Sequence, residues 1–291
     1  MIFTLLDTDN NVLLDTDDNE ILSAGTLHNH EGAMVLSQVV DQLRPNAGRL
    51  CWRSIVSETV VTATSEEDDN PVTNLANPST AFVWVATSTD QQDIDVEIGT
   101  VIDYIGIARH NLQQAAEIRI QFLVGATYFT VFDWANVPAR QVLLYSINEA
   151  EPDGIRISIR NNPTPPSIAV LYAGVSTILQ RNLYVGHTPI TLGRNVSTVG
   201  GYSENGQYLG EVVRREGRST SVQLSNLTPT WYRGELDPFI AQRPRKPAFF
   251  AWRPSSYPAE VGYVWLSGSP RPSNQRANGM MEISMEFEGI A

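Results

Sequence analysis

Short runs in which apolar and polar residues alternate dominate this chain of 291 residues, and they restrict its fold more than any other feature. Successive side chains of a strand point to opposite faces, so such runs predict strands with one buried face. Gly, Pro, Asn and Asp separate the runs, which follow one another at intervals of about ten residues. The sequence therefore predicts an all-β protein built from sandwiches or barrels.

The expected strands fall into two groups that meet near residues 175–182. A chain of this length is long for one hydrophobic core, so the two groups predict two domains. We expect strands at residues 2–6, 12–15, 55–64, 82–87, 94–98, 104–110, 117–124, 141–146, 154–160 and 167–174 before the boundary, and at 183–185, 212–215, 219–224, 248–253, 262–267 and 280–287 after it.

Two segments have the spacing of helices. Residues 31–43 place Met34, Val35, Val39 and Leu43 near one face, and Pro45 follows as a stop. Residues 229–242 follow Thr228 as N-cap, with Pro229 in the first helical position and Pro238 predicting a kink or a helix in two pieces. The second helix has an apolar stripe of Tyr232, Leu236, Phe239 and Ile240, for which core packing is the expected role.

We expect three segments: residues 1–53, residues 54–176 as the first β domain, and residues 177–291 as the second. The first segment would supply strands and a helix to the second domain, which makes the first domain an insertion. Alternatively, it is an arm that reorders when copies assemble. The sequence leaves these two possibilities open.

Charge is distributed unevenly along the chain, whose net charge is −12. Residues 1–103 contain 18 Asp and Glu against 3 Arg, and residues 104–291 contain 14 against 17 Arg and Lys. The acidic first third opposes phosphate binding, so we expect no nucleic-acid partner. The split either orients copies that stack head to tail or marks a solvated acidic surface. Nearly all basic residues are Arg, which suits interfaces but also follows from a biased genome composition.

Cysteine usage and the apolar runs indicate where the chain is made. Cys51 is the only cysteine, so no intrachain disulfide is possible, and we expect its thiol to be buried and inert. The start, "MIFTLLDTDNN", lacks the basic region of a signal peptide. No run approaches the roughly 20 apolar residues that span a bilayer. We expect synthesis in the cytoplasm and no membrane span.

No catalytic or metal-binding constellation is visible. No G-x-S-x-G motif surrounds a serine, and no GxGxxG or Walker-type loop occurs. The carboxylates of "SEEDD" (65–69) are adjacent, whereas acid–base catalysis needs two carboxyls set across a cleft. His28, His30 and Glu31 form too short a cluster for a tetrahedral metal site, and the Asp-rich stretches at 7–11 and 15–18 are typical of turns. We expect no enzyme activity, no metal and no cofactor.

Residues 54–174 resemble the galactose-binding-like jelly roll of the discoidin or coagulation-factor type C family. The matching segments are, in order, "IVSETVVTAT", "DDNPVTNLANPSTAFVWVAT", "DIDVEIG", "TVIDYIGIARHNL", "EIRIQFLVG", "GIRISIR" and "SIAVLYAG". In that family a tryptophan packs under the loop that precedes it, so the resemblance implies a structural clamp formed by Asn74, Thr80, Trp84 and Gly99.

The same resemblance implies a possible sugar site. Some family members bind sugars through loops at one end of the sandwich, and this gives Trp134, Arg109, His110 and Asn111 as candidates. Trp134 is expected to lie in a loop and to offer its ring to the sugar. Many members also hold calcium in the loop before the tryptophan, but the usual acidic position falls near Ala76 here, which argues against a metal.

Residues 210–290 are similar to the ring-forming β domain of distal tail and baseplate proteins of long-tailed bacteriophages. The similarity is one of order: an Arg-Glu-Gly hairpin at 215–217, a helix, the segment "PAFFAW" and a final strand that ends near Glu288-Gly289. In those proteins a split β-barrel flanked by a helix assembles into a hexameric ring that extends the tail tube. The resemblance implies self-association and contacts with tube, hub and other baseplate proteins.

Three functions follow as hypotheses. The first is a non-catalytic virion structural protein of the tail tip, which forms a ring and carries the jelly roll outward. The second is a carbohydrate-binding protein or module that recognises host surface glycans. The third, a β-sandwich adhesin of a cell surface, is disfavoured by the missing export signal.

Overall fold

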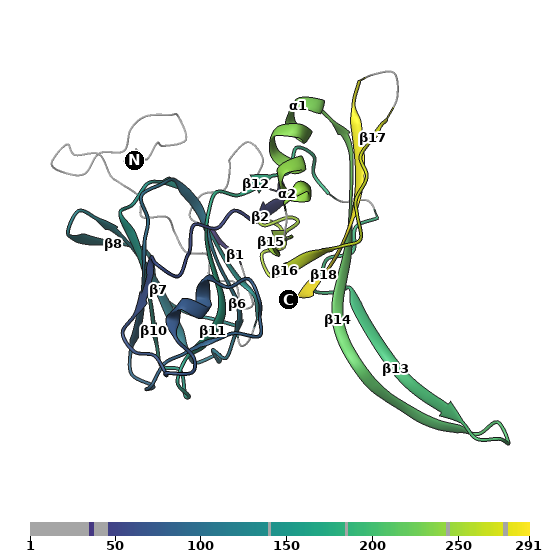
Figure 1. Ribbon diagram of the computed structural model, residues 1–291, viewed down its shortest axis with the longest axis horizontal. Coiled ribbons are helices and arrows are strands. Elements are labelled where there is room, and N and C mark those ends of the chain that lie inside the picture. Colours follow the sequence, from purple (N-terminus) through teal and green to yellow (C-terminus); the bar gives the residue numbers. More distant parts are fainter. Residues whose placement is uncertain (1–34, 38–45, 139–140, 184–185, 243–244, 276–278) are drawn as a thin grey trace.

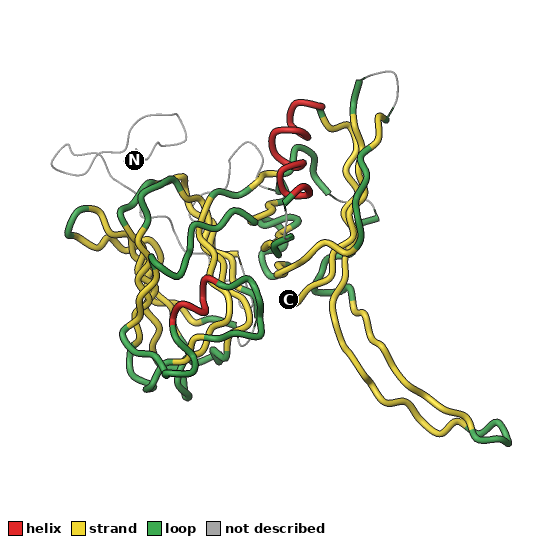
Figure 2. Tube along the Cα trace, in the orientation of Figure 1, coloured by secondary structure: helices red, strands yellow, loops and turns green. Residues whose placement is uncertain are grey.

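The computed structural model describes residues 35–37, 46–138, 141–183, 186–242, 245–275 and 279–291 (Figure 1). Strands make up most of it, and Figure 2 shows two β domains joined side by side with one small helical segment on the second. The predicted all-β fold class is confirmed: a β-sandwich jelly roll of two sheets is followed by a second β domain with a flanking helix. The strands predicted at 2–6 and 12–15 lie outside the described residues.

The jelly roll consists of two five-stranded sheets that enclose one core. The inner sheet, which faces the second domain, has the order β1 (Val35–Ser37), β9 (Leu143–Ala150), β6 (Ile102–His110), β11 (Ser167–Gly174) and β4 (Trp84–Val85). The outer sheet has the order β3 (Val61–Ala63), β5 (Gln92–Glu97), β10 (Gly154–Arg160), β7 (Glu117–Val124) and β8 (Thr127–Asn136). A 3₁₀ helix, Val72–Ala76, lies in the loop before β4.

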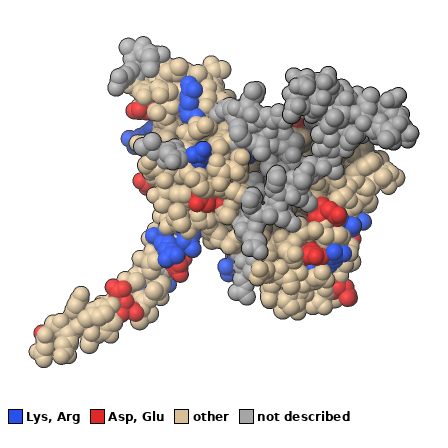
Figure 3. Space-filling model, turned by 180° about the vertical axis from the view of Figure 1, so that it is seen from behind, with Lys and Arg blue, Asp and Glu red and all other residues tan. Residues whose placement is uncertain are grey.

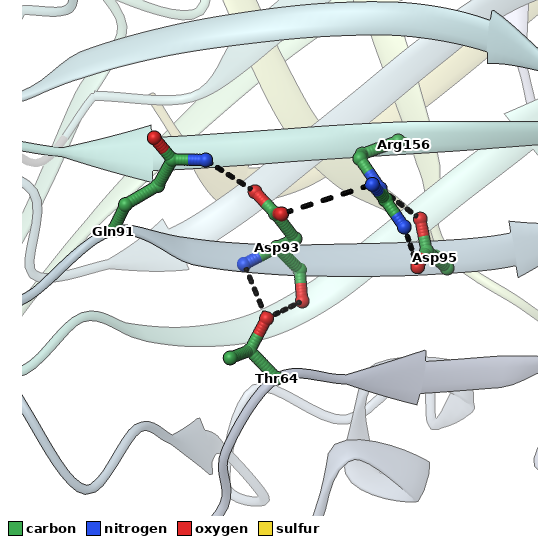
Figure 4. Close-up of polar contacts among 5 residues, drawn as sticks. All are labelled: Thr64, Gln91, Asp93, Asp95 and Arg156. Atoms are coloured by element: carbon green, nitrogen blue, oxygen red, sulfur yellow. Dashed lines mark hydrogen bonds and ion pairs between the residues drawn. The ribbon is translucent and has the colours of Figure 1, made fainter. Parts of the chain in front are cut away.

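The alternation of apolar and polar residues explains which side chains of the outer sheet are buried. In β5 the side chains of Ile94 and Val96 are buried, whereas Asp93 and Asp95 between them face outward. On that outer face Arg156 donates to Asp95 through Nε and Nη2, both at 2.7 Å, and lies 3.9 Å from Asp93 (Figure 4). Gln91 donates to the Asp93 carboxylate at 3.0 Å. The outer face is therefore a solvated network of paired charges.

Strand β6 is buried along almost its whole length because both of its faces are covered. One face packs in the jelly-roll core, and the other meets the second domain. A Cβ at Gly106 would lie 2.7–2.8 Å from ring atoms of Phe249, so glycine is required for this close approach.

The second domain is built on one large sheet with the order β12 (Thr177–Ile178), β2 (Arg49–Cys51), β15 (Ala248–Ala251), β16 (Val261–Ser267), β18 (Met281–Ile290), β14 (Tyr208–Leu227) and β13 (Arg194–Tyr202). Strand β17 (Ser273–Asn274) pairs with β18 off this path. Because β2 and β12 are neighbours in this sheet, strands β3–β11 of the jelly roll lie between two strands of the second domain in the sequence, and only β1 precedes them.

The predicted helix at 229–242 is confirmed, and it is made of three pieces. These are α1 (Pro229–Trp231), a π-helical turn at Tyr232–Leu236 and α2 (Asp237–Ala241), which begins beside Pro238. The proline ring excludes a continuous α-helical hydrogen-bond ladder at that point. Tyr232, Leu236 and Phe239 are buried in the core of the second domain.

The predicted helix at 31–43 is wrong where the structure describes it, at Val35–Ser37. These residues form β1, which pairs in parallel with β9 at the edge of the inner sheet. Pairing with an existing sheet edge overrides a weak local helical pattern. The remainder of that segment lies outside the described residues.

An apolar interface with a polar margin joins the two domains. The rings of Tyr172, Phe249 and Tyr263 are mutually in contact, with centroids 5.0–5.9 Å apart. At the margin the Asp103 carboxylate accepts hydrogen bonds from the backbone N–H and hydroxyl of Ser176, both at 2.6 Å. Burial raises the pKa of Asp103, whereas these bonds and Arg49 at 3.7 Å oppose that rise.

Candidate functional site

A β-hairpin projects from the second domain into solvent, and it is the most exposed element of the described chain (Figure 1). We define the arm as residues 194–218, which comprise β13 and the paired half of β14. Its apolar side chains are 45–72% exposed: Val196, Val199, Tyr202, Tyr208, Leu209, Val212 and Val213. Seven exposed large apolar side chains on one hairpin form a surface that a monomeric soluble protein rarely presents.

The arm continues the core of the second domain without a break. Strand β14 is 20 residues long, and its other half pairs with β18 and buries Val222 and Leu224. At the base the Arg218 side chain donates to the Thr191 carbonyl at 2.8 Å, and Gly193 leaves room for the Ser219 carbonyl. The arm is therefore an extension of a central strand, anchored at its base.

Charge on the arm changes with distance from the domain. Arg194, Arg214 and Arg218 lie toward the base together with Glu216, whereas Glu204 and Glu211 lie toward the end. Figure 3 shows blue side chains where the arm leaves the domain and red ones further along. Except for Val196, which pairs with Glu216 near the base, the apolar residues lie within residues 198–213, which contain no Arg or Lys. The outer part of the arm therefore combines exposed hydrophobic surface with no positive side chain.

The arm was not predicted from the sequence. Two short strands, 212–215 and 219–224, were expected where one strand, Tyr208–Leu227, runs through, and β13 was not expected at all. The hairpin expected at residues 215–217 is therefore wrong: these residues lie inside β14, where Glu216 and Gly217 pair with β13. A signal was present in Asn205-Gly206 between Tyr202 and Tyr208, because Asn-Gly flanked by strand-forming residues is typical of a hairpin turn. In the structure the turn runs from Ser203 to Gln207, where the Gly206 N–H donates to the Ser203 carbonyl at 2.8 Å and Gly206 has a φ of 77°.

A cavity of about 600 Å³ lies between the jelly roll and the base of the arm. Arg109, Asn111 and Ser167 line it from the jelly roll, and Glu216 and Arg218 line it from the arm. A smaller cavity of about 230 Å³ shares the arm wall and is lined further on by Trp265 and Glu288. We call the two together the groove.

Three of the four sugar candidates, Arg109, His110 and Asn111, lie together at this groove. Arg109 is exposed, with a φ of 55° at the end of β6. Asn111 is engaged in the loop: its amide donates to the Pro165 carbonyl at 2.8 Å, and its oxygen accepts from the Ser167 N–H at 2.9 Å. The structure therefore leaves Arg109 exposed and uses Asn111 to hold the loop.

His110 is buried and also structural. Its Nε2 lies 2.5 Å from the Gln141 carbonyl, and its Nδ1 accepts from the Leu112 N–H at 3.2 Å, which assigns a neutral ring protonated at Nε2. Burial lowers the pKa of His110 to about 4, although the bond to Gln141 opposes that shift. A neutral, fully used imidazole holds the backbone after Arg109 and does not face a ligand.

The lowered pKa of His110 predicts an acid-sensitive fold. The unfolded chain takes up a proton on this ring near its ordinary pKa of about 6.5, whereas the folded chain does so only near 4. Between those values the free energy of unfolding is expected to fall by about 1.4 kcal/mol per pH unit through this group. Urea unfolding at pH 7, 6 and 5 of wild type and His110→Gln measures it. As the pH falls, the wild type should lose unfolding free energy relative to His110→Gln, because only the wild type carries this ring. A difference in unfolding free energy that stays constant between pH 7 and 5 would contradict the assignment.

Trp134, the fourth sugar candidate, is not part of this site. It lies in strand β8 and not in a loop, which corrects the prediction. Its ring packs against the guanidinium groups of Arg160 and Arg119, at 4.0 and 4.6 Å from the centroid. These contacts belong to the outer face of the outer sheet, and cation–π packing explains why a tryptophan stands there.

Two of the four residues predicted to form the clamp, Trp84 and Asn74, have hydrogen bonds in this loop. The Trp84 ring is fully buried and donates from Nε1 to the Ser65 carbonyl at 3.0 Å. The Asn74 amide donates to the Val83 carbonyl at 2.8 Å, across the same loop. Thr80 lies half-buried there, and its role stays a prediction. Gly99 is not required: a Cβ there would meet no atom within 4 Å, and its φ is not positive.

Cys51 is fully buried within β2. Burial raises the pKa of its thiol well above the usual value, the charge of Asp103 adds to that rise, and Arg49 opposes it. The thiol is therefore protonated and inaccessible, as the sequence indicated.

Two properties of the described residues concern metals and membranes. Among the described residues, no group of three or more His, Cys, Asp or Glu side chains is placed to hold a metal ion. His28, His30 and Glu31 lie outside them. Every helix in the described ranges is too short or too polar to cross a bilayer.

Comparisons with known proteins give no match to a family model and none to a curated protein. Among solved structures, a family 32 carbohydrate-binding module from C. perfringens NanJ in complex with galactose is 15% identical, with 43% of this chain and 98% of that chain covered and a TM-score of 0.37. Chitosan-binding module 1 from a Paenibacillus sp. IK-5 chitosanase/glucanase is 15% identical, with 42% and 98% covered and a TM-score of 0.37. The jelly-roll fold of this chain follows from the strand order of its two five-stranded sheets.

Proposed function

We propose that this protein is a non-catalytic structural subunit of the phage virion, which assembles into a ring that joins the tail tube to the tail tip. The observation that carries the proposal is the arm, whose seven exposed apolar side chains project away from both domains. Burying such side chains releases about 1.5–3 kcal/mol each, so contact with another subunit stabilises the assembly.

The similarity of residues 210–290 to ring-forming tail proteins supports the same proposal. The flanking helix, the segment at Ala248–Ala251 and the closing strand at Met281–Ile290 occur in the structure in the order that the similarity implies. Ring closure by copies of one chain needs two different surfaces that fit each other, and an arm that reaches beyond its own domain is suited to such a contact.

The proposal is tested by the mass and shape of the purified protein. We expect a native mass that is a multiple of 32.2 kDa, with six copies implied by the similarity, and closed rings in negative stain. A protein that stays monomeric at high concentration, alone and with its tube and hub partners, would contradict the proposal.

A second candidate function is glycan binding by the jelly roll. The observation that favours it is the cavity of about 600 Å³ at Arg109 and Asn111, a size typical of small-ligand sites. Galactose, the sugar in the C. perfringens complex, is the first neutral ligand to test by titration. Saturable chemical-shift changes at residues 109–112 would support this function, and no response to a panel of saccharides would exclude it.

A further inference from the structure

We infer that the groove binds a carboxylated saccharide, such as a hexuronic acid chain, between Arg109 of the jelly roll and Arg218 of the arm base. This inference rests on the second candidate function, glycan binding, and it names the class of glycan and the site. Both arginines line the larger cavity from different domains, and Arg218 is held there by the hydrogen bond from its Nη1 to the Thr191 carbonyl at 2.8 Å. A guanidinium pairs with a carboxylate through two parallel N–H donors, which is the geometry that a uronic acid offers.

The backbone of Arg109 is the first argument. Its φ of 55° lies in the left-handed region, which costs a residue other than glycine about 1 kcal/mol or more. Strain of this kind persists where the surroundings impose it, and it concentrates at ligand sites. Here His110 and Asn111 impose it, since both side chains are fixed by hydrogen bonds to the neighbouring loops.

The exposure of the Arg109 side chain is the second argument. Among the described residues no acidic side chain forms an ion pair with it, whereas other arginines of the jelly roll pair with Asp95 and Glu117. A strained residue on a rigid loop thus presents a free guanidinium to the groove.

The other residues that line the groove determine which class of anion can bind there. Glu216 and Glu288 also line the groove, and their charges repel a ligand with dense negative charge, such as a polyphosphate. A saccharide with one carboxylate per ring carries less negative charge toward these residues, and its hydroxyl groups can donate to Glu216, which lines both cavities. Trp265 in the smaller cavity offers an aromatic surface for a second ring.

The test is a titration of the full chain with trigalacturonate and, as the neutral control, with a galactose trisaccharide, followed by calorimetry. The variants are Arg109→Gly and Arg218→Gln, and the matched control is Arg233→Gln, an exposed arginine on the helix far from the groove. We expect wild type and Arg233→Gln to bind trigalacturonate equally, and each groove variant to lose at least tenfold in affinity.

Arg109→Gly separates binding from folding. Glycine adopts a φ of 55° without strain, so the variant is expected to keep the wild-type Tm while it loses the ligand. Unchanged trigalacturonate affinity in either groove variant would overturn the inference. Binding of the neutral sugar alone would overturn it and leave the second candidate function standing, and binding of neither sugar would overturn both.

Discussion

Serine at Tyr202, Leu209 and Val212 is expected to yield folded monomers under conditions in which the wild type assembles. All three side chains are more than 60% exposed in the single chain, so the substitutions leave both cores intact. If each side chain is buried against another copy, their removal costs about 5 kcal/mol or more per contact. That loss weakens association by a factor of about 10³ to 10⁴. Mass photometry across a concentration series measures the shift.

A matched triple variant controls for the loss of exposed apolar surface. Phe82, Val124 and Phe129 are similarly exposed, at 52–55%, but they lie on the jelly roll. Serine at these three positions is expected to leave assembly unchanged. If the control disrupts assembly as strongly as the arm variant, the arm is not the element that joins the copies.

Trp84→Ala is expected to cost the jelly roll about 3–5 kcal/mol of unfolding free energy. The substitution removes the largest fully buried side chain and leaves a cavity in the core, and the Ser65 carbonyl loses the donor that satisfies it. Phe82→Ala, two residues earlier in the same loop, should change stability by less than about 0.5 kcal/mol, because Phe82 is half exposed. Urea unfolding followed by circular dichroism compares the two. Equal effects would show that Trp84 does not hold the loop.

Strands with one solvated face and strands buried on both faces were both predicted from their apolar residues. Strand β10 of the outer sheet and the buried strand β11 of the inner sheet have the expected bounds, whereas β5 was expected at 94–98 and spans Gln92–Glu97. In the outer sheet Ile94 and Ile157 point inward while Asp95 and Arg156 point outward. Strand β8 was not predicted from the sequence. Its residues are largely exposed on both faces, so its sequence carries little alternation, and Trp134 was assigned to a loop.

At the candidate site, too, the local sequence did not show which side chains face a ligand. The resemblance placed Arg109, His110 and Asn111 together correctly, since they are consecutive, but it did not distinguish a ligand-facing side chain from structural ones. That distinction depends on Gln141 and Pro165, which lie 30 or more residues away in the sequence and meet this loop only after folding. The arm base likewise contributes Arg218 across a domain boundary, which local patterns do not reveal.

Helix prediction was correct where the sequence supplied both a stripe and boundary residues. Thr228 and Pro229 mark the start of the helical segment, and Leu236 and Phe239 on one face bury it. At Val35–Ser37 the stripe had no comparable support, and pairing with β9 determined the structure instead.

Site-specific cross-linking from the arm tests the central claim most directly. Because Cys51 is the only native cysteine and is buried, Val212→Cys carries the one accessible thiol of the protein. A benzophenone attached there is predicted to link subunits on irradiation and to give covalent multimers, with the linked peptides assigned by mass spectrometry to a second copy. The same probe at Phe82→Cys on the jelly roll is predicted to leave the chain monomeric on a denaturing gel. Multimers absent from the arm probe at concentrations where rings form would contradict the claim that the arm joins the copies.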